Sequence, residues 1–350
     1  MKIFIQVLWV VSCMFLHNCK STNKVLDNDF RLNKDTIEYD YTIAFGSCNK
    51  QDVPNLLWTS ILKHNPNLWI WGGDNIYSDT DNMTKMKLDY NQQLSDKNYK
   101  KLIESAKILG TWDDHDYGLN DGGLEFVKKK ESQQQFLDFI GVSPTDKRRR
   151  QSGVYHSEII HHKKGTINII ILDTRYFRSS LTDDDETKKR YKPNKYGVGT
   201  VLGEQQWVWL EENLKTSKAD FNIIVSSIQF LSKEHGFETW GNFPHEVDRL
   251  TTLISESKAK GVLLLSGDRH ISEFSKMDIK GMDYPLVDFT SSGLTHSYTN
   301  YSGELNSYRV GKVISEISFG LLHFNFKKRE IIMQMRGMND VKLQELIQTY

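Results

Sequence analysis

Apolar runs of strand length recur along most of the chain and alternate with segments of helical pattern. The runs are rich in Ile, Val and Leu, which is typical of strands buried on both faces. We expect strands at residues 41–48, 67–74, 107–114, 153–160, 167–174, 221–229, 261–270, 285–293, 315–326 and 330–338. Between several of these runs, apolar residues recur at helical spacing, so we expect helices at residues 53–65, 125–141, 202–217 and 244–261. Alternating strands and helices predict an α/β layered domain, and the late run of strands predicts a second, partly antiparallel sheet.

The first residues do not follow this pattern. Lys2 precedes an apolar run, residues 3–16, that is short for a bilayer span but suits the apolar core of a secretory signal. Cys19 and the polar stretch after it are similar to a bacterial lipoprotein signal, with Cys19 as the lipidated residue. Cys13 fits the local pattern better, and an ordinary cleaved signal or a short membrane anchor are alternatives. We therefore divide the chain into a signal at residues 1–19, a tether at 20–38 and a folded domain at 39–350.

Composition narrows the partners that the domain can have. Among 350 residues, Lys+Arg and Asp+Glu both number 45, so the formal net charge is zero. No long-range positive field would draw the protein to nucleic acid or to an anionic membrane. We therefore expect no nucleic-acid partner, and contact with a membrane only through an N-terminal lipid anchor. We also expect a monomer.

Cysteine usage draws attention to one residue. The chain has three cysteines, and if Cys13 and Cys19 belong to the signal, Cys48 is alone in the folded domain. An exported protein would meet a compartment that favours disulfides, yet Cys48 has no partner there. It is either a small buried apolar residue or a residue with a chemical task.

Short polar clusters follow five of the predicted strands. They occupy residues 46–49, 72–75, 112–115, 226–229 and 267–270. Ligands of open α/β sheets bind beyond the carboxyl ends of the strands, so these clusters are expected to converge on one site. The third cluster lies in the segment Thr111–Asp121, which holds four aspartates and His115. Carboxylates so close together raise one another's pKa unless a cation lies among them.

The residue types indicate which cations fit. Oxygen and imidazole donors, which suit Mg, Ca, Mn, Fe or Zn, are offered by Asp74, Asp114, Asp268 and His270. Cys48 and Tyr77 would add a thiolate and a phenolate, which favour ferric iron or zinc over magnesium. A pair of metals that acts on phosphorus needs a carboxylate able to bridge them, and Asp74 is the candidate.

Five motifs in order carry a resemblance to a known family. They are FGSCNKQ, WGGDNIYSD, TWDDHDYGLND, SSIQF and SGDRHISEF, and they fall within residues 41–295. Together they resemble the PhoD-like (alkaline phosphatase D) branch of the metallophosphoesterases. The resemblance implies a four-layer α/β/β/α sandwich with two mixed β-sheets and hydrolysis of phosphate monoesters or diesters.

The resemblance also implies the centre that does this chemistry. It would be binuclear or trinuclear, with Fe³⁺ and Ca²⁺ expected first and Zn²⁺, Mg²⁺ or Mn²⁺ as alternatives. By this resemblance the metal-binding residues are Cys48, Asp74, Tyr77, Asp114, Asp268 and His270. Cys48 replaces the D-x-H of the wider superfamily, and His115 matches its catalytic histidine.

Several neighbouring residues have two interpretations each. Arg175, our second catalytic candidate, could hold a phosphate through its planar guanidinium or only pair with Asp173. Asp113 and Asp116 could orient His115 or cap the next helix. Contact with substrate or support of the metal ligands is also expected of Asn75 and Gln229.

The expected function is that of an exported phosphoric ester hydrolase, located in the periplasm, on the outer membrane as a lipoprotein, or secreted. Its substrate would be a phosphate ester. A metal-bound hydroxide would attack phosphorus, and His115 would protonate the leaving oxygen. One alternative is a phosphodiesterase or phospholipase that acts on lipid head groups. The other is a lipoprotein that binds a phosphorylated ligand without turnover.

Overall fold

Two β-sheets face each other in the computed structural model, which describes residues 39–350. The first sheet has the order β15-β14-β13-β1-β2-β3 and the second has the order β12-β10-β11-β9-β8-β5-β4. The first comprises β1 (Tyr41–Gly46), β2 (Leu68–Gly72), β3 (Lys107–Thr111), β13 (Phe319–Asn325), β14 (Glu330–Arg336) and β15 (Lys342–Thr349). The second comprises β4 (His156–His162), β5 (Gly165–Ile171), β8 (Phe221–Val225), β9 (Val262–Ser266), β10 (Ser272–Met277), β11 (Leu286–Ser291) and β12 (Arg309–Ile314). Both are mixed, since β1 is parallel to β2 but antiparallel to β13, and β9 is parallel to β8 while β10 is antiparallel to β11.

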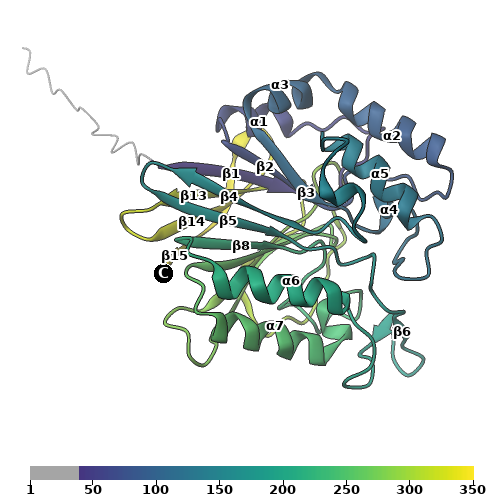
Figure 1. Ribbon diagram of the computed structural model, residues 1–350. Coiled ribbons are helices and arrows are strands. Elements are labelled where there is room, and N and C mark those ends of the chain that lie inside the picture. The colour runs from purple at the N-terminus through teal and green to yellow at the C-terminus, as the bar shows by residue number, and fades with distance from the viewer. Residues whose placement is uncertain (1–38) are drawn as a thin grey trace, which may run out of the picture. The chain divides into compact units, whose positions relative to one another are not determined.

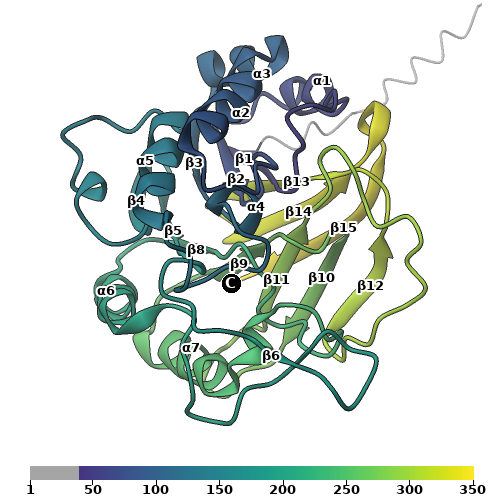
Figure 2. The same cartoon turned by 90° about the vertical axis from the view of Figure 1, so that its right-hand side faces the viewer.

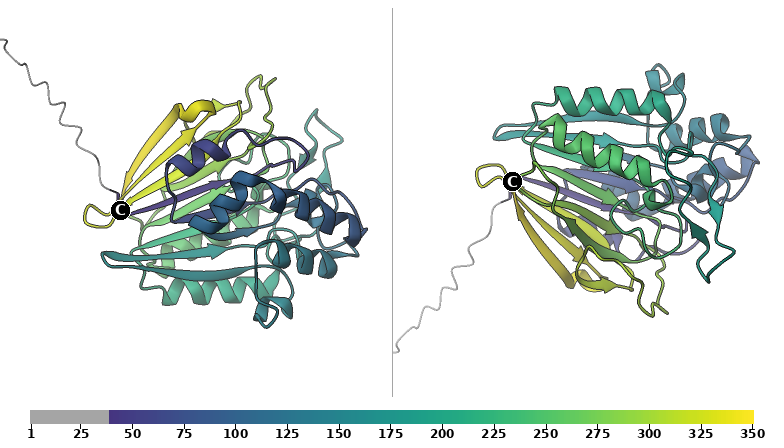
Figure 3. Two further views of the ribbon diagram at one scale, coloured as in Figure 1. Left: turned by 90° about the horizontal axis from the view of Figure 1, so that it is seen from above. Right: turned by 90° about the horizontal axis from the view of Figure 1, so that it is seen from below.

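Helices cover the outer face of each sheet (Figures 1 and 3). Those on the first sheet are α1 (Trp58–Lys63), α2 (Met83–Ser95), α3 (Lys97–Ser105), α4 (Asp114–Tyr117) and α5 (Lys129–Phe139). The second sheet carries α6 (Gly203–Thr216) and α7 (Pro244–Ser257). A small hairpin, β6 (Thr182–Asp183) with β7 (Tyr191–Lys192), lies outside both sheets. The expected α/β/β/α sandwich with two mixed sheets is confirmed.

Alternation of side chains along buried strands builds the layers. In β2, Leu68 and Ile70 belong to the core between the sheets, whereas Trp69 and Trp71 pack under α1 and α3. The two tryptophans contact the Trp58 ring edge to face, with centroids 5.2 and 5.7 Å away. Both faces of the strand are apolar, which explains its continuous hydrophobic sequence. The prediction that such runs are strands buried on both faces is confirmed for β2.

The late strands are distributed differently from our prediction. We expected them to form one second sheet, but β13, β14 and β15 extend the first sheet through the pairing of β13 with β1. Only β10, β11 and β12 join the second sheet. Each sheet therefore combines early strands with late ones through long-range pairing, on which local patterns carry no information.

Some elements were not predicted because their apolar patterns are weak. In α2 only three residues are buried, Met86, Tyr90 and Gln93. Strand β10 has the polar sequence SEFSKM, yet its first four residues are buried. The carboxylate of this strand is satisfied by side chains from other loops, since Glu273 accepts hydrogen bonds from Gln229 and Asn306 at 2.9 and 3.0 Å.

The predicted signal and tether, residues 1–38, lie outside the described residues. Within residues 39–350, no helix combines the length and the apolar character needed to cross a membrane.

Candidate metal centre

The loops after four strands, β1, β2, β3 and β9, bring the predicted metal ligands together at one end of the sandwich. Gly73 has φ +103°, and a Cβ on it would lie 2.6 Å from Cβ of Asp113 and 3.0 Å from Cβ of Ser227. A Cβ on Gly267 would lie 2.5 Å from Oγ of Ser47 and 2.8 Å from the Gly72 carbonyl oxygen. The glycines therefore let loops of the two sheets touch at this end.

The backbone is unusual at the candidate ligands themselves. Cys48, Asp74, Asp268 and His270 all have positive φ, at 59°, 49°, 66° and 55°. Non-glycine residues rarely adopt this left-handed conformation, and such strain concentrates at functional sites. Here it turns each side chain away from its strand direction and into the space between the sheets' ends.

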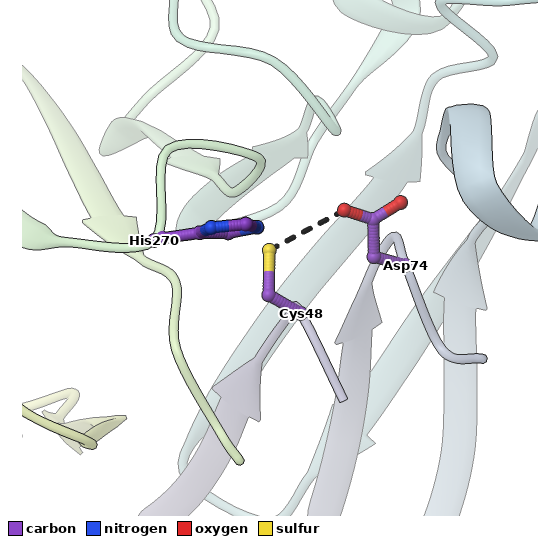
Figure 4. Close-up of side chains that lie close together, drawn as sticks. All are labelled: Cys48, Asp74 and His270. Carbon is purple, nitrogen blue, oxygen red and sulfur yellow. Dashed lines mark hydrogen bonds between the residues drawn. The ribbon is translucent and has the colours of Figure 1, made fainter. Parts of the chain in front are cut away.

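Cys48, Asp74 and His270 form the first of three donor groups, and their side chains point toward one another (Figure 4). Sγ of Cys48 lies 3.3 Å from Oδ2 of Asp74. Burial raises the pKa of the Cys48 thiol to about 12, and the nearby Asp268 charge adds to the rise. A metal cation would reverse this effect, because it deprotonates a coordinating thiol.

Ser292 supports this group. Its Oγ accepts a hydrogen bond from the backbone N–H of His270 at 2.7 Å, so its own hydrogen remains available. Sγ of Cys48 lies 3.0 Å from the same Oγ. Either group can donate when the cysteine is a thiol, but toward a thiolate only the Ser292 hydroxyl can donate.

The Tyr77 hydroxyl lies next to this first donor group. It is 2.9 Å from Nε2 of His270 and 3.4 Å from Oδ2 of Asp74. Burial and the negative charges of Cys48 and Asp74 raise the pKa of this phenol well above its usual value. The first group therefore combines a thiol, a phenol, an imidazole and a carboxyl.

The second and third donor groups share Asp74 with the first. They are Asp74 with Asp114 and His115, and Asp74 with Asp113, Asp114 and Asp268. Burial and mutual repulsion raise the pKa values of Asp74 and Asp268 well above the usual range. A cation among these oxygens would remove that cost, so the donor chemistry fits a metal.

The two carboxylate oxygens of Asp113 have different surroundings. Its Oδ1 accepts hydrogen bonds from Nε of Arg175 at 2.5 Å and from Oγ of Ser227 at 2.6 Å. Its Oδ2 is buried and has no hydrogen-bond partner among the described residues. Asp113, which we expected to orient His115 or to cap the next helix, thus offers a free oxygen within the four-carboxylate group.

His115 lies at the N-terminal turn of α4 and lines the adjoining cavity. Its Nδ1 is 2.7 Å from Oδ1 of Asp79, and its ring stacks on Tyr77 with centroids 4.1 Å apart. Burial acts to lower the pKa of His115, but the bond to Asp79 and the charge of Asp114 outweigh it, so the pKa is raised.

Asp116 has the capping role that we left open. Its Oδ1 accepts a hydrogen bond from the Asp113 N–H at 2.6 Å, across the start of α4. Its Oδ2 accepts a bond from Nδ2 of Asn75 at 2.5 Å, and Asn75 also donates to the Thr111 carbonyl at 3.0 Å. Asn75 and Asp116 therefore lock the loop after β2 to the loop after β3.

Comparison with known proteins now bears on this arrangement. A family model described as PhoD-like phosphatase matches residues 43–344. The chain belongs to the PhoD-like phosphatase family. It is 24% identical over 288 residues to alkaline phosphatase D of Bacillus subtilis (strain 168), a match that covers 73% of this chain and 49% of that protein. The chain thus spans about half the length of that curated relative.

Solved structures show the same fold. A structure of PhoD superposes with a TM-score of 0.71 at 18% identity, covering 89% of this chain and 69% of that one. A dimetal phosphatase from Danio rerio superposes with a TM-score of 0.53 at 12% identity, covering 89% of this chain and 100% of that one.

Two of our site predictions place the side chain wrongly. Arg175 of this PhoD-like chain is fully buried, and its guanidinium bonds Asp113 and Glu238, each at 2.5 Å, instead of Asp173 or an open pocket. Gln229 is 1% exposed and donates to Glu273 and Thr290, both at 2.9 Å. Both residues follow a strand that ends at the site, but their side chains turn into the protein.

Three further residues that were not predicted as site residues lie at the site: Asp79, Arg269 and His296. Asp79 and Arg269 stand inside two of the quoted motifs, which is the signal that could have found them. His296 is half-buried, with its ring centroid 4.4 Å from that of His270. A cavity of about 460 Å³ opens beside the centre, and Asp114, His115, Asp268 and His270 form part of its lining.

Proposed function

We propose that this protein is an exported, metal-dependent phosphoric ester hydrolase. One observation carries the proposal: Asp74 is common to three groups of metal-binding side chains, beside a cavity that His115 lines. A shared carboxylate is what two adjacent ions require, and adjacent ions suit displacement at phosphorus. Family membership supports the same reaction class.

The donor sets suggest which ions fit. Thiol, phenol, imidazole and carboxyl groups meet at Cys48, Tyr77, His270 and Asp74, a set that favours ferric iron, with zinc as the alternative. Asp74, Asp113, Asp114 and Asp268 offer oxygen alone, which favours calcium, with magnesium or manganese as alternatives. Such a centre would be binuclear or trinuclear.

The protein's own residues supply orientation and a proton. Bound metals would lower the pKa of water and neutralise charge on the phosphoryl oxygens. His115 reaches the cavity while Asp79 holds its Nδ1, which leaves Nε2 to give a proton to the leaving oxygen. The raised pKa of His115 keeps the donating form populated to higher pH. Arg175 does not contact the substrate in this proposal. It holds the Asp113 carboxylate in place through a hydrogen bond.

Export rests on the sequence pattern of residues 1–38 alone. We propose a lipid anchor at Cys19, which would place the enzyme in the periplasm or on the outer membrane.

The test is an assay of purified protein on p-nitrophenyl phosphate and bis(p-nitrophenyl) phosphate, paired with metal analysis of the same sample. We expect hydrolysis of at least one ester, bound iron and calcium, and loss of both metals and rate in Asp268→Asn. Binding of inorganic phosphate without turnover of either ester would instead identify a binding protein.

A further inference from the structure

The cavity beside the metal centre is larger than a phosphoryl group requires. Its volume of about 460 Å³ falls within the range of small-molecule sites, about 300–1,000 Å³. One wall is the metal centre. A second wall comprises four further lining residues that none of the assigned chemistry uses, Arg190, Phe237, Arg269 and Tyr298.

Two guanidinium groups in the wall retain free donors. Nη2 of Arg190 bonds Asp121 at 2.6 Å, and the side chain is 52% exposed. Nη2 of Arg269 bonds both oxygens of Glu304, at 3.0 and 2.9 Å, and the side chain is 9% exposed. Each guanidinium carries five N–H donors, so one carboxylate leaves most of them unused. Nε of Arg269 is buried without any partner among residues 39–350.

Aromatic rings stand beside these cations. The Arg269 guanidinium carbon lies 4.2 Å from the Phe237 ring centroid, and Phe237 is 37% exposed. The Arg190 backbone N–H donates to the Gly236 carbonyl at 3.0 Å, which places Arg190 next to Phe237 along the wall. Tyr298 is 40% exposed, and its backbone N–H donates to the His270 carbonyl at 2.8 Å. Exposed rings next to unsatisfied guanidinium donors are a recognition surface for an anion on a carbon skeleton.

The positions also explain why neither arginine suits the scissile phosphate. Arg190 comes from the β6–β7 hairpin, which belongs to neither sheet and lies at the end of the molecule where α4 lies (Figures 1 and 2). Arg269 follows Asp268 directly, but its side chain is drawn toward Glu304 and Phe237. Both are therefore placed to meet the organic part of the ester.

We propose that Arg190, Arg269 and Phe237 form a subsite for a second oxyanion, a carboxylate or a phosphate, carried by the alcohol part of the substrate. The inference rests on the proposed hydrolase function and names the substrate class within it. Small phosphate esters with a second negative charge are then the preferred substrates.

Three aryl esters of one skeleton test the subsite. They are 4-carboxyphenyl, 4-phosphonophenyl and 4-carbamoylphenyl phosphate, of which the third matches the first in shape but is neutral. We expect kcat/KM for a charged ester to exceed that for the amide by about tenfold, and the better of the two charged esters identifies the oxyanion. The preference should fall with added salt, because the Arg190 side chain is exposed.

Arg190→Gln should reduce this preference to about twofold or less, mainly through KM, and Arg190→Lys should keep part of it because the charge remains. Arg249→Gln is the matched control. Arg249 is likewise paired with a carboxylate and stacked on a ring, but it lies outside the cavity. Bound metal in each variant shows that the centre is intact.

The outcomes distinguish a failure of the proposed hydrolase function from a failure of the proposed oxyanion subsite. If no ester is hydrolysed, the proposed function is wrong. If the charged esters and the amide are hydrolysed equally well, or if Arg190→Gln keeps the wild-type preference, the protein is a hydrolase and the subsite is wrong.

Discussion

Nδ1 of His115 lies 2.7 Å from Oδ1 of Asp79, although 36 positions separate the two residues in the chain. The contact fixes the orientation of the imidazole, and Tyr77 holds its other side by stacking. The Asp79 side chain is 45% exposed and that of His115 is 18% exposed, so an exposed carboxylate orients a histidine that can act as acid or base.

Asp79→Asn should therefore lower both the pKa of His115 and the rate. A histidine with a raised pKa stays protonated above pH 6.5 and loses the proton, with the stability of the pair, as pH rises through the raised value. Without Asp79 the descending limb of kcat should move to lower pH, and kcat should fall about tenfold. The exposed Asp81 gives the control, Asp81→Asn, whose pH profile should match wild type. Identical profiles for both variants would remove Asp79 from the mechanism.

His115→Asn tests the acid itself. Metal content should stay at the wild-type level while turnover falls by about 10²–10⁴-fold, the usual contribution of a general acid. The loss should be smaller for a nitrophenyl ester, whose leaving group needs little protonation, than for an alkyl ester. An equal loss on both esters would contradict a proton-donating role.

Ser292→Ala tests the hydrogen bond to Cys48. If the Cys48 thiolate binds ferric iron, its visible absorption band should move to longer wavelength when the Ser292 donor is lost. Ser47→Ala is the comparison variant and should move the band less, because Oγ of Ser47 lies farther from the sulfur, at 3.8 Å, and also donates to the Ser291 carbonyl at 3.1 Å. Metal analysis must show equal iron in both. A coloured Ser292→Ala protein with an unmoved band would exclude the bond.

Arg175→Met should destabilise the fold more than it changes substrate binding. It would leave Asp113 as a buried charge without a cationic partner and Glu238 with Arg178 alone, 2.8 Å away, a loss of about 3–5 kcal/mol. Arg249→Met, at an exposed pair, should cost about 1 kcal/mol or less. Denaturant unfolding measures both. Unchanged stability with a raised KM would restore our first interpretation, in which Arg175 binds phosphate.

Cys19 should carry the lipid anchor. Labelled palmitate fed to the native host should be incorporated into wild type and Cys13→Ser but not into Cys19→Ser. Label that depends on Cys13 instead would move the anchor point, and absence of label from all three would leave only an exported, unanchored protein.

The sequence predicted the layered fold and the residues that meet at the candidate centre for a clear physical reason. Cys48, Asp74 and Asp268 each follow a strand whose apolar run is unmistakable, and parallel strands end at one edge. The position of a residue after a strand does not determine the direction in which its side chain points. Gln229 and Arg175 also follow such strands, but the choice between inward and outward depends on partners such as Glu273 and Glu238 that are distant in the sequence.

Sheet assignment of the late strands was out of reach for the same reason. Strand β13 pairs with β1 across nearly the whole chain, with Tyr41 opposite Phe324. No local pattern indicates which sheet such a strand joins. The polar strand β10 was missed because the hydrogen-bond partners of Glu273, Asn306 and Arg309, are distant in the sequence.

The central claim is that ester hydrolysis depends on metal ions bound through Asp74. Removal and return of the metals test it most directly. The rate of ester hydrolysis is measured for wild type as purified, after a chelator, and after return of iron and calcium, with Asp74→Asn measured alongside. Because Asp74 is common to all three donor groups, the account predicts that chelation abolishes the rate, that the metals restore it, and that Asp74→Asn stays inactive with metals added. A chelated protein that keeps its full rate, or an Asp74→Asn protein as active as wild type, would contradict it.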